Sequence, residues 1–366
     1  ANLHGIKGSE LGKKPYFCIV NIHEIYMFRA IECAKNTSID CYPNPRVGCV
    51  IIDDTGQIIG QGTTAPYGGP HAEVVALNSV QNREKLAGAS LYVTLEPCAH
   101  YGKTPPCSLA IIQSGIKRVY IGCTDPNPLV CSQGIHQLTE HGLEVFVGIL
   151  ESACLEHHKR FLTFQTKHRP YITLKWAQTL EGFMAPTHAL RSKKEPFRLS
   201  SHPVNQRVHQ WRSQEAAILI GVQTALDDRP QLNTRLWNGP DPIPMVFDPH
   251  GRASESAPLW KHPSAIHIGP PIELGKQVNH WTLTQYSIDE VLKKAYEQGI
   301  ISIFVEGGAY TLTKWLDSGQ WDEIRVIQVD KPLEQGLLAP KLMTSPTSSE
   351  ILGPDRIDYY RAVGHE

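Results

Sequence analysis

Apolar residues along the chain occur either in short continuous runs or at helical spacing. Runs such as Val47 to Ile52 and Ala216 to Ile220 have the length of buried strands. From Glu24 to Ala34 the apolar residues recur every three or four positions, which predicts a helix. No run approaches the roughly 20 apolar residues that a membrane-spanning helix needs. We therefore expect a soluble protein with both strands and helices.

Strands and helices alternate through the first half of the chain. The expected strands span residues 47–52, 57–60, 91–95, 118–123 and 143–147. The expected helices span residues 24–34, 72–80, 107–113 and 134–140. Thr104 is a plausible N-cap for the third helix, followed by two prolines in its first turn. This alternation predicts a partly parallel sheet covered by helices.

A boundary is expected near residue 167, where a segment rich in charged residues and histidine ends before Pro170. We predict domains over 20–167 and 168–366. In the second domain, strands are expected at 171–176, 216–221, 244–248, 301–305 and 323–329. Helices are expected near 204–211, 288–297 and 310–316. The second domain is therefore also of the α/β class.

Length and charge narrow the classes of function. The 366 residues are enough for two domains that each bury a core. Lys and Arg total 35 against 36 Asp and Glu. This balance excludes binding to nucleic acid or an anionic membrane through a broad positively charged surface. The nine cysteines are odd in number and widely spread, so we expect reduced thiols and a cytoplasmic location. Residues 1–14 show no signal-peptide order and are left out of the fold argument.

A candidate zinc site begins at Pro70-His71-Ala72-Glu73 and continues at Glu96-Pro97-Cys98 and Cys107. One imidazole and two thiolates leave the fourth tetrahedral position of Zn²⁺ open to water, which is the arrangement of a catalytic site. Glu73 lies close to the metal position without ligating it. A carboxylate there can take a proton from zinc-bound water and pass it to a ring nitrogen and then to the leaving amine, as in zinc deaminases.

Other interpretations of these residues remain open when each is taken alone. A His-x-Glu sequence is common by chance, and a pair of cysteines is more often buried packing. A structural zinc would need a fourth ligand, for which Cys123, Cys131 and His100 are candidates. The combination of a helix start after a Gly-Gly-Pro loop with cysteines after a strand favours the catalytic site.

Three segments carry a resemblance to a known family. The segment from Thr94 to Cys107 resembles the zinc segment of the bifunctional riboflavin biosynthesis deaminase–reductases. Pro43 to Gly48 and Asp125 to Pro128 are similar to that family's other deaminase motifs. The resemblance extends over about residues 23 to 366.

The resemblance implies two domains with two consecutive reactions. It implies a cytidine-deaminase-like three-layer α/β/α domain, followed by an α/β domain with the fold of dihydrofolate reductase. The first would use Zn²⁺ to remove the 2-amino group of 2,5-diamino-6-ribosylamino-4(3H)-pyrimidinone 5′-phosphate. The second would reduce the ribosyl chain of the product to ribityl with NADPH. The expected partners are this small phosphorylated pyrimidine and further copies of the chain in a dimer or tetramer, with no nucleic acid or membrane.

The resemblance also implies substrate contacts in the first domain. The implied residues are Asn44, His100, Lys103, Asp125 and Asn127. Lys103 can meet a phosphate as a point charge, and Asn44 can read a pyrimidine edge. The alternatives are turn-forming Asn and Asp beside prolines and a solvated lysine. Thr64 departs from the family, which usually has a histidine at this position.

In the second domain, the segments 174–182, 211–213, 217–235 and 305–308 resemble the reductase. The implied catalytic residue is Lys175, and the implied substrate contacts are Arg212, Arg235 and Glu306. The implied cofactor contacts are Gln178, Arg198, Ser200, Thr224, Asp228, Gly307 and Gly308. Backbone N–H groups after Gly307-Gly308 could cradle a phosphate, although two glycines before a helix more often form a plain turn. The chain has no G-x-G-x-x-G motif, consistent with a fold other than the dinucleotide-binding one.

Departures from the family gather in the second domain. Glu181 stands in place of an aspartate, Arg198 in place of a tryptophan, and residues 185–196 lack the usual Gly-Glu-Ser loop. One alternative is therefore a deaminase whose second domain binds ligand without reducing it. Another is a nucleobase deaminase acting on nucleic acid, which usually shows P-C-x-x-C, whereas eight residues separate Cys98 from Cys107 here.

Overall fold

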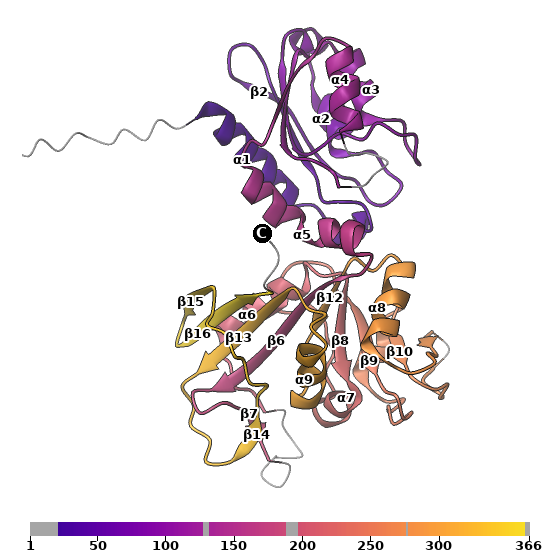
Figure 1. The fold of residues 1–366 in the computed structure, drawn as a ribbon, viewed down its shortest axis with the longest axis vertical. Coiled ribbons are helices and arrows are strands. Elements are labelled where there is room, and N and C mark those ends of the chain that lie inside the picture. The colour runs from indigo at the N-terminus through magenta and orange to yellow at the C-terminus, as the bar shows by residue number, and fades with distance from the viewer. Residues whose placement is uncertain (1–20, 127–131, 188–196, 276, 363–366) are drawn as a thin grey trace, which may run out of the picture.

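The chain forms two α/β units that meet at helix α5 (Glu151–Lys167), as Figure 1 shows. The computed structural model describes residues 21–126, 132–187, 197–275 and 277–362. Within these ranges, no helix combines the length and the apolar character needed to cross a membrane.

The described part of the N-terminal unit holds a five-stranded sheet in the order β2-β1-β3-β4-β5. Its strands are β1 (Gly48–Ile52), β2 (Ile58–Thr63), β3 (Ser90–Leu95), β4 (Arg118–Cys123) and β5 (Glu144–Val147). β1 runs antiparallel to β2 and β3, whereas β3, β4 and β5 are parallel. The expected partly parallel sheet is confirmed.

Helices cover both faces of this sheet and make three layers (Figure 1). α1 (Ile22–Lys35) and α5 lie on one face, and α2 (Ala72–Ser79), α3 (Cys107–Ser114) and α4 (Gln133–Glu140) lie on the other. Every residue of β1 is buried because the strand is covered on both sides. α1 packs directly on the start of β1, where a Cβ at Gly48 would lie 2.0 Å from the Ala30 carbonyl oxygen, so only glycine fits.

The described part of the C-terminal unit holds a nine-stranded sheet in the order β11-β10-β9-β8-β12-β6-β13-β16-β15. Its strands are β6 (Tyr171–Thr179), β8 (Ala217–Gly221), β9 (Ile243–Phe247), β10 (Ile266–Ile268), β11 (Asn279–Trp281), β12 (Ser302–Val305), β13 (Glu323–Val329), β15 (Ser348–Leu352) and β16 (Asp355–Arg361). The strands are parallel from β11 to β13, and β16 and β15 are added antiparallel. β7 (Phe183–Pro186) and β14 (Gly336–Leu338) form a separate small pair.

Two apolar clusters pack on the two faces of this larger sheet. One contains side chains of α8 (Ile288–Glu297) and α9 (Ala309–Asp317), and the other contains side chains of α6 (His202–Arg212) and α7 (Val222–Asp228). Along β8, Ala217 and Leu219 belong to the first cluster, whereas Ile218 and Ile220 belong to the second. This alternation is the pleat of a strand buried on both faces.

The expected strands and helices all have counterparts in the structure, with ends shifted by a few residues. One expectation about a helix end was wrong, because the N-cap of α3 is Pro106 and not Thr104. The first two amides of α3 are satisfied by Cys98 instead: Cys107 N–H donates to its sulfur at 3.4 Å and Ser108 N–H to its carbonyl oxygen at 3.2 Å. The start of the helix is thus tied to the preceding loop, and no hydroxyl cap is needed.

The sequence interpretation also missed α5, α7 and the short strands β7, β10, β11, β14, β15 and β16. Buried residues of α5 recur at helical spacing, at Cys154, His158, Phe161 and Phe164. This signal was present in the sequence but was masked by the many charged side chains between these positions.

Candidate functional site

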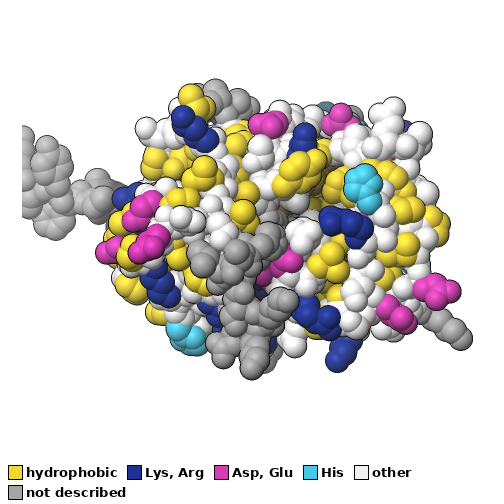
Figure 2. All heavy atoms as spheres, turned by 90° about the horizontal axis from the view of Figure 1, so that it is seen from below, with side chains coloured by type: hydrophobic (Ala, Val, Ile, Leu, Met, Phe, Trp, Pro, Cys, Tyr) yellow, Lys and Arg dark blue, Asp and Glu magenta, His cyan; other side chains and the backbone are white. Residues whose placement is uncertain are grey.

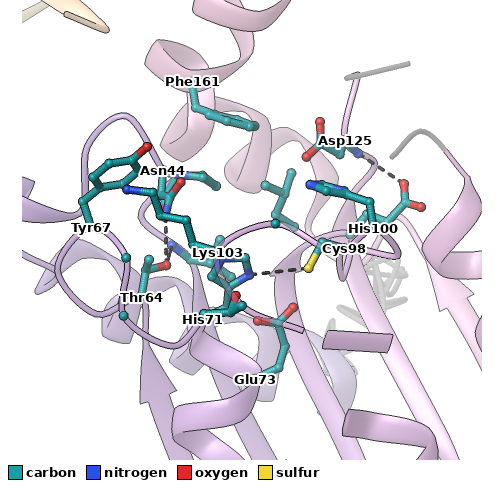
Figure 3. Close-up of a pocket in the computed structure, with 18 of the residues that line it drawn as sticks. Asn44, Thr64, Tyr67, His71, Glu73, Cys98, His100, Lys103, Asp125 and Phe161 are labelled. Carbon is teal, nitrogen blue, oxygen red and sulfur yellow. Dashed lines mark hydrogen bonds between the residues drawn. The ribbon is translucent and has the colours of Figure 1, made fainter. Parts of the chain in front are cut away.

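The residues of the candidate zinc site meet at one edge of the N-terminal sheet, where His71, Glu73 and Cys98 line a cavity of about 270 Å³ (Figure 3). His71 is the N-cap of α2, Cys98 follows β3, and Cys107 begins α3. β1 is antiparallel to β3, so the chain entering β1 and the chain leaving β3 lie at the same edge. The fold therefore gathers loops from distant parts of the sequence around one pocket.

The distances between the three donor atoms fit a zinc ion. His71 Nδ1 lies 3.5 Å from Cys98 Sγ and 3.3 Å from Cys107 Sγ, and all three donor atoms lie within 4.8 Å of one another. Tetrahedral Zn²⁺ with ordinary bond lengths separates a nitrogen and a sulfur ligand by about 3.6 Å. Among the described residues this is the one cluster of its kind, and Cys123, a candidate fourth ligand, instead donates to Thr94 O.

Burial and hydrogen bonding shift the pKa values of three side chains at this site. Glu73 is 3% exposed, and burial together with the neighbouring Cys98 raises the pKa of its carboxyl to about 7. Hydrogen bonding with the Cys107 thiol holds the pKa of Cys98 well below its usual value, and the same contact raises the pKa of Cys107. The pocket thus contains one thiol that readily becomes thiolate and a carboxyl able to exchange a proton near neutral pH.

Two further lining residues have structural partners. Glu96 accepts hydrogen bonds from the backbone N–H groups of Gly134 and Ile135 at the start of α4, at 3.1 and 3.4 Å, and so anchors the loop that leads to Cys98. Thr64 accepts from Val47 N–H at 3.0 Å and donates to Pro45 O at 2.8 Å. Where the family usually has a histidine, this chain therefore has a buried hydroxyl that joins two loops.

Four of the expected substrate residues line the same pocket, namely Asn44, His100, Lys103 and Asp125. The fifth, Asn127, lies outside the described residues. Sequence interpretation missed Tyr67, Phe161 and Gln165, which also line it. Tyr67 immediately precedes the glycine loop before His71, whereas Phe161 and Gln165 belong to α5, whose helical spacing was overlooked.

A second ionisable cluster lies in the C-terminal unit around Glu306, at the carboxyl end of β12. Arg212 donates two hydrogen bonds of 2.7 and 2.9 Å to the Glu306 carboxylate, and Lys175 Nζ lies 3.6 Å from Glu306 Oε2. Although burial opposes the charge, Arg212 and Lys175 hold the pKa of Glu306 at about 2. Burial lowers the pKa of Lys175, against the attraction of Glu306. Arg212 also donates to Asn233 O, so its guanidinium chiefly organises Glu306 and the neighbouring loop.

The other expected substrate and cofactor residues of this unit lie in several places. Partial burial lowers the pKa of Arg235, and the positive charges of Arg212 and Arg198 lower it further. The three guanidinium groups therefore lie close enough to interact electrostatically. Gln178 accepts a hydrogen bond from the Trp176 indole at 2.7 Å, and Ser200 donates to Asn205 at 2.9 Å. The remaining two lie on α7, Thr224 in the first turn and Asp228 at the opposite end.

The glycine turn before α9 leaves the start of that helix without a side-chain cap. Gly308 is the N-cap of α9, so the first backbone N–H groups of the helix are open to an anion. A Cβ at Gly307 would lie 2.8 Å from Thr311 Cβ, and one at Gly308 would lie 3.3 Å from Thr224 Oγ1. The two glycines thus let the strand end approach α7 and α9 closely, beside Glu306.

Figure 2 shows the end of the molecule formed by the C-terminal unit, seen from below. Basic, acidic and apolar side chains are interspersed over the described part of this face. The described residues in this view therefore present no broad basic surface, as the balanced composition leads one to expect.

Comparisons with known proteins match both units. A family model for the cytidine and deoxycytidylate deaminase zinc-binding region matches residues 20–123, and one for the RibD C-terminal domain matches residues 170–335. The riboflavin biosynthesis protein RibD of Aquifex aeolicus is 37% identical over 365 residues, which cover 94% of this chain and 99% of that protein. The RibD protein of Bacillus amyloliquefaciens is 38% identical over 339 residues, which cover 88% of each chain.

Solved structures agree over nearly the whole molecule. The diaminohydroxyphosphoribosylaminopyrimidine deaminase/5-amino-6-(5-phosphoribosylamino)uracil reductase of Thermotoga maritima matches with a TM-score of 0.84 and 34% identity, over 93% of this chain and 99% of that one. RibD of Acinetobacter baumannii matches with a TM-score of 0.82 and 30% identity, over 93% and 98%. The expected fold classes of both units are confirmed. The chain belongs to the RibD family of riboflavin biosynthesis enzymes, which join a zinc-dependent pyrimidine deaminase to an NADPH-dependent reductase.

Proposed function

We propose that residues 20–167 carry out the deamination and residues 168–366 the reduction, each with its own set of side chains. The first reaction removes the 2-amino group of 2,5-diamino-6-ribosylamino-4(3H)-pyrimidinone 5′-phosphate as ammonia. The second converts the ribosyl chain of the product to ribityl. The division is supported by the separate placement of the two clusters, one beside the N-terminal sheet and the other at the carboxyl end of β12 in the C-terminal sheet.

In the deaminase, His71, Cys98 and Cys107 would hold the zinc ion. Zinc in such a site lowers the pKa of a coordinated water, so that hydroxide is available at neutral pH. Glu73 takes a proton from the attacking water, delivers it to the ring nitrogen next to the reacting carbon, and then assists the departure of ammonia. Its burial suits it to this exchange, since its pKa of about 7 lets it both accept and release a proton.

The substrate is held by residues around this centre. Asn44 and Asp125 offer hydrogen bonds to the pyrimidine edge, His100 lies at the exposed rim, and Lys103 meets the phosphate. Asn127 is assigned to the same group on the family resemblance alone. The mixture of one cation with several neutral and acidic groups suits a small ligand that carries a single phosphate.

In the reductase, the residues around Glu306 would bind substrate, and the turn at Gly307-Gly308 would bind NADPH. NADPH supplies the hydride. Lys175 holds a proton beside the ribosyl oxygen that is freed when the sugar ring opens, and Glu306 keeps the Lys175 ammonium in place. Arg235 meets the substrate phosphate, while Arg212 keeps Glu306 ionised. Gln178, Arg198, Ser200, Thr224 and Asp228 are assigned to the cofactor on the family resemblance.

The observation that carries the deaminase assignment is the set of three donors with the buried Glu73 beside it. The Glu73→Ala variant should lose ammonia release while keeping one zinc per chain and full reduction of the deaminated product. Ammonia release, metal content and NADPH absorbance measure these three properties. Deamination that survived this change would contradict the role of Glu73.

The reductase assignment is tested with the deaminated substrate and NADPH. Saturable loss of NADPH absorbance would support it. Binding of NADPH without turnover would instead support a second domain that only binds ligand. The departures from the family at Glu181 and Arg198 would then be candidate causes of the lost activity.

We also assign the chain to the cytoplasm and to a homo-oligomer, a dimer or a tetramer. The seven described cysteines are free thiols, which suits a reducing compartment. Large apolar side chains are exposed in the C-terminal unit at Leu338, Met343 and Ile351, the last on the edge strand β15. Light scattering at several protein concentrations tests the oligomeric state.

A further inference from the structure

The deaminase pocket offers a phosphate few positive charges. Among the described residues that line it, Lys103 is the one Lys or Arg, whereas Glu73, Glu96 and Asp125 are carboxylates. Figure 3 shows Lys103 on one side of the pocket and Asp125 on the other. The place of the Lys103 ammonium therefore decides where an anionic group of the substrate can bind with least repulsion.

Lys103 is exposed, yet its side chain does not extend freely into solvent. Its ammonium nitrogen lies 3.9 Å from the centre of the Tyr67 ring, which is a close cation–π contact. Its Cδ passes over Gly68, where an added Cβ would lie 3.8 Å away. The Lys103 side chain thus runs beside Gly68 and ends over the Tyr67 ring, next to which Figure 3 shows it.

The loop beneath the lysine is held by backbone hydrogen bonds. Tyr67 N–H donates to Asp40 O at 2.9 Å, and Gly69 N–H donates to Pro66 O at 2.8 Å. Gly68 has a φ of +91°, which a residue with a side chain rarely adopts. The backbone that carries Tyr67 is therefore held in place at the pocket wall.

We propose that Tyr67 is a positioning residue of the deaminase, whose ring face holds the Lys103 ammonium where it meets the phosphate of the substrate. This rests on the proposed deaminase function and goes beyond it, because it makes the aromatic ring a determinant of selectivity for the phosphorylated pyrimidine. Fixing a long lysine side chain costs conformational entropy. The cation–π contact offsets that cost before the substrate arrives, so phosphate binding is strengthened while the chemical step at zinc is unchanged.

The test compares Tyr67→Leu, Tyr67→Phe and the unaltered full-length chain with two substrates, the phosphorylated pyrimidine and its dephosphorylated form. For the phosphorylated substrate, Tyr67→Leu should raise KM about two- to fivefold with little change in kcat, as the size of an exposed cation–π contact predicts. Tyr67→Phe keeps the ring face and should keep the KM of the unaltered chain. For the dephosphorylated substrate, all three proteins should have the same KM.

A matched control is Tyr101→Leu, since Tyr101 lies two positions from Lys103, is 74% exposed and does not line the pocket. It should leave both KM values unchanged. Competitive inhibition by inorganic phosphate gives a second measurement, and its inhibition constant should rise in Tyr67→Leu alone. Metal content and reduction of the deaminated product show that each variant is folded.

Three results would overturn the proposal: an unchanged KM in Tyr67→Leu, an equal rise in Tyr67→Phe, or an equal rise with the dephosphorylated substrate. The second would assign the effect to the hydroxyl, and the third to general packing of the loop. Failure of the unaltered chain to release ammonia from the phosphorylated substrate would overturn the deaminase function itself, and is seen before any variant is made.

Discussion

Buried ionisable side chains are costly unless a partner or a reaction explains them, and each unit of this enzyme has such a group at its proposed site. Glu73 is almost completely buried beside the zinc donors, and Lys175 has a side chain that is 13% exposed. Arg212 and Glu306 are not catalytic in themselves on this view, because their mutual hydrogen bonds leave Lys175 as the group that can move a proton.

Lys175→Met keeps the length of the side chain and removes its charge and its proton. We expect reduction of the deaminated product to fall by about 10²-fold or more, as for the loss of a general acid, while ammonia release stays unchanged. NADPH absorbance and ammonia release measure the two activities in the same preparation. The control is Lys35→Met, since the Lys35 side chain is 55% exposed and lies in α1, far along the chain from either cluster. Undiminished reduction by Lys175→Met would remove this residue from the mechanism.

Helix α5 is a main contact between the two units, beside the loop at Tyr42, whose hydroxyl donates to Gln214 O. One side of it completes the deaminase pocket with Phe161 and Gln165. Arg160 on the same helix forms a bidentate ion pair with Glu215, which follows α6 and is fully buried. Next to it, Lys159 Nζ lies 2.6 Å from Glu323 Oε2 in β13. The wall of one active site is thus anchored in the other unit.

Removing one partner of the Arg160–Glu215 pair should leave a buried charge without compensation. Arg160→Met is expected to lower the stability of the chain by about 3–5 kcal/mol, measured by thermal unfolding. The double variant with Glu215→Leu should recover much of this loss, because neither charge is then buried alone. Glu32→Gln, in the exposed pair with Lys35, is a control expected to change stability by less than about 1 kcal/mol. Equal losses in the single and double variants would contradict this account.

Two adjacent histidines of α5 make a pH dependence of stability measurable. Burial lowers the pKa of His157 to about 4 and lowers that of His158 well below its usual value. Because both folded-state values are depressed, the contribution of the neutral histidines is fully present above the unfolded value of about 6.5 and is lost as the pH falls toward 4. Each histidine should cost about 1.4 kcal/mol for every pH unit below about 6.

Chemical denaturation at pH 7.5 and at pH 5 measures this loss. His157→Gln, which can still donate a hydrogen bond to Arg46 O, should give a shallower dependence on pH than the unaltered chain. A denaturation midpoint that does not change between these two pH values would show that the histidines are not held neutral in the fold.

The two proposed sites share no residue among those described. The described residues of the deaminase pocket end at Gln165, and the cluster around Glu306 is built from residues 175 onward. An equimolar mixture of Glu73→Ala and Lys175→Met chains should therefore carry out both steps, because the intermediate can diffuse from one chain to the other. NADPH consumption started with the first substrate should show a lag and then a steady rate. A mixture that never consumed NADPH would indicate that the intermediate must pass within one chain.

The candidate chemistry of the first unit could be predicted from the amino-acid sequence alone. His71, Glu73, Cys98 and Cys107 are recognisable because each lies at the end of a helix or strand, and zinc admits few combinations of ligands. The alternation of strands and helices also predicted both α/β units, since strands buried on two faces read as continuous apolar runs. The elements predicted in this way were found with their ends nearly correct, whereas α5, whose periodicity is interrupted by charged side chains, was missed.

The side chains that complete the sites and keep them in place could be found only from the way the chain packs in three dimensions. Tyr67, Phe161 and Gln165 reach the pocket through a loop and a helix that carry no motif. The contact of Lys103 with Tyr67 joins residues 36 positions apart, and the ion pair of Arg160 with Glu215 joins residues 55 positions apart. Such contacts depend on how loops and helices pack, and neither hydrophobic periodicity nor motif spacing contains that information.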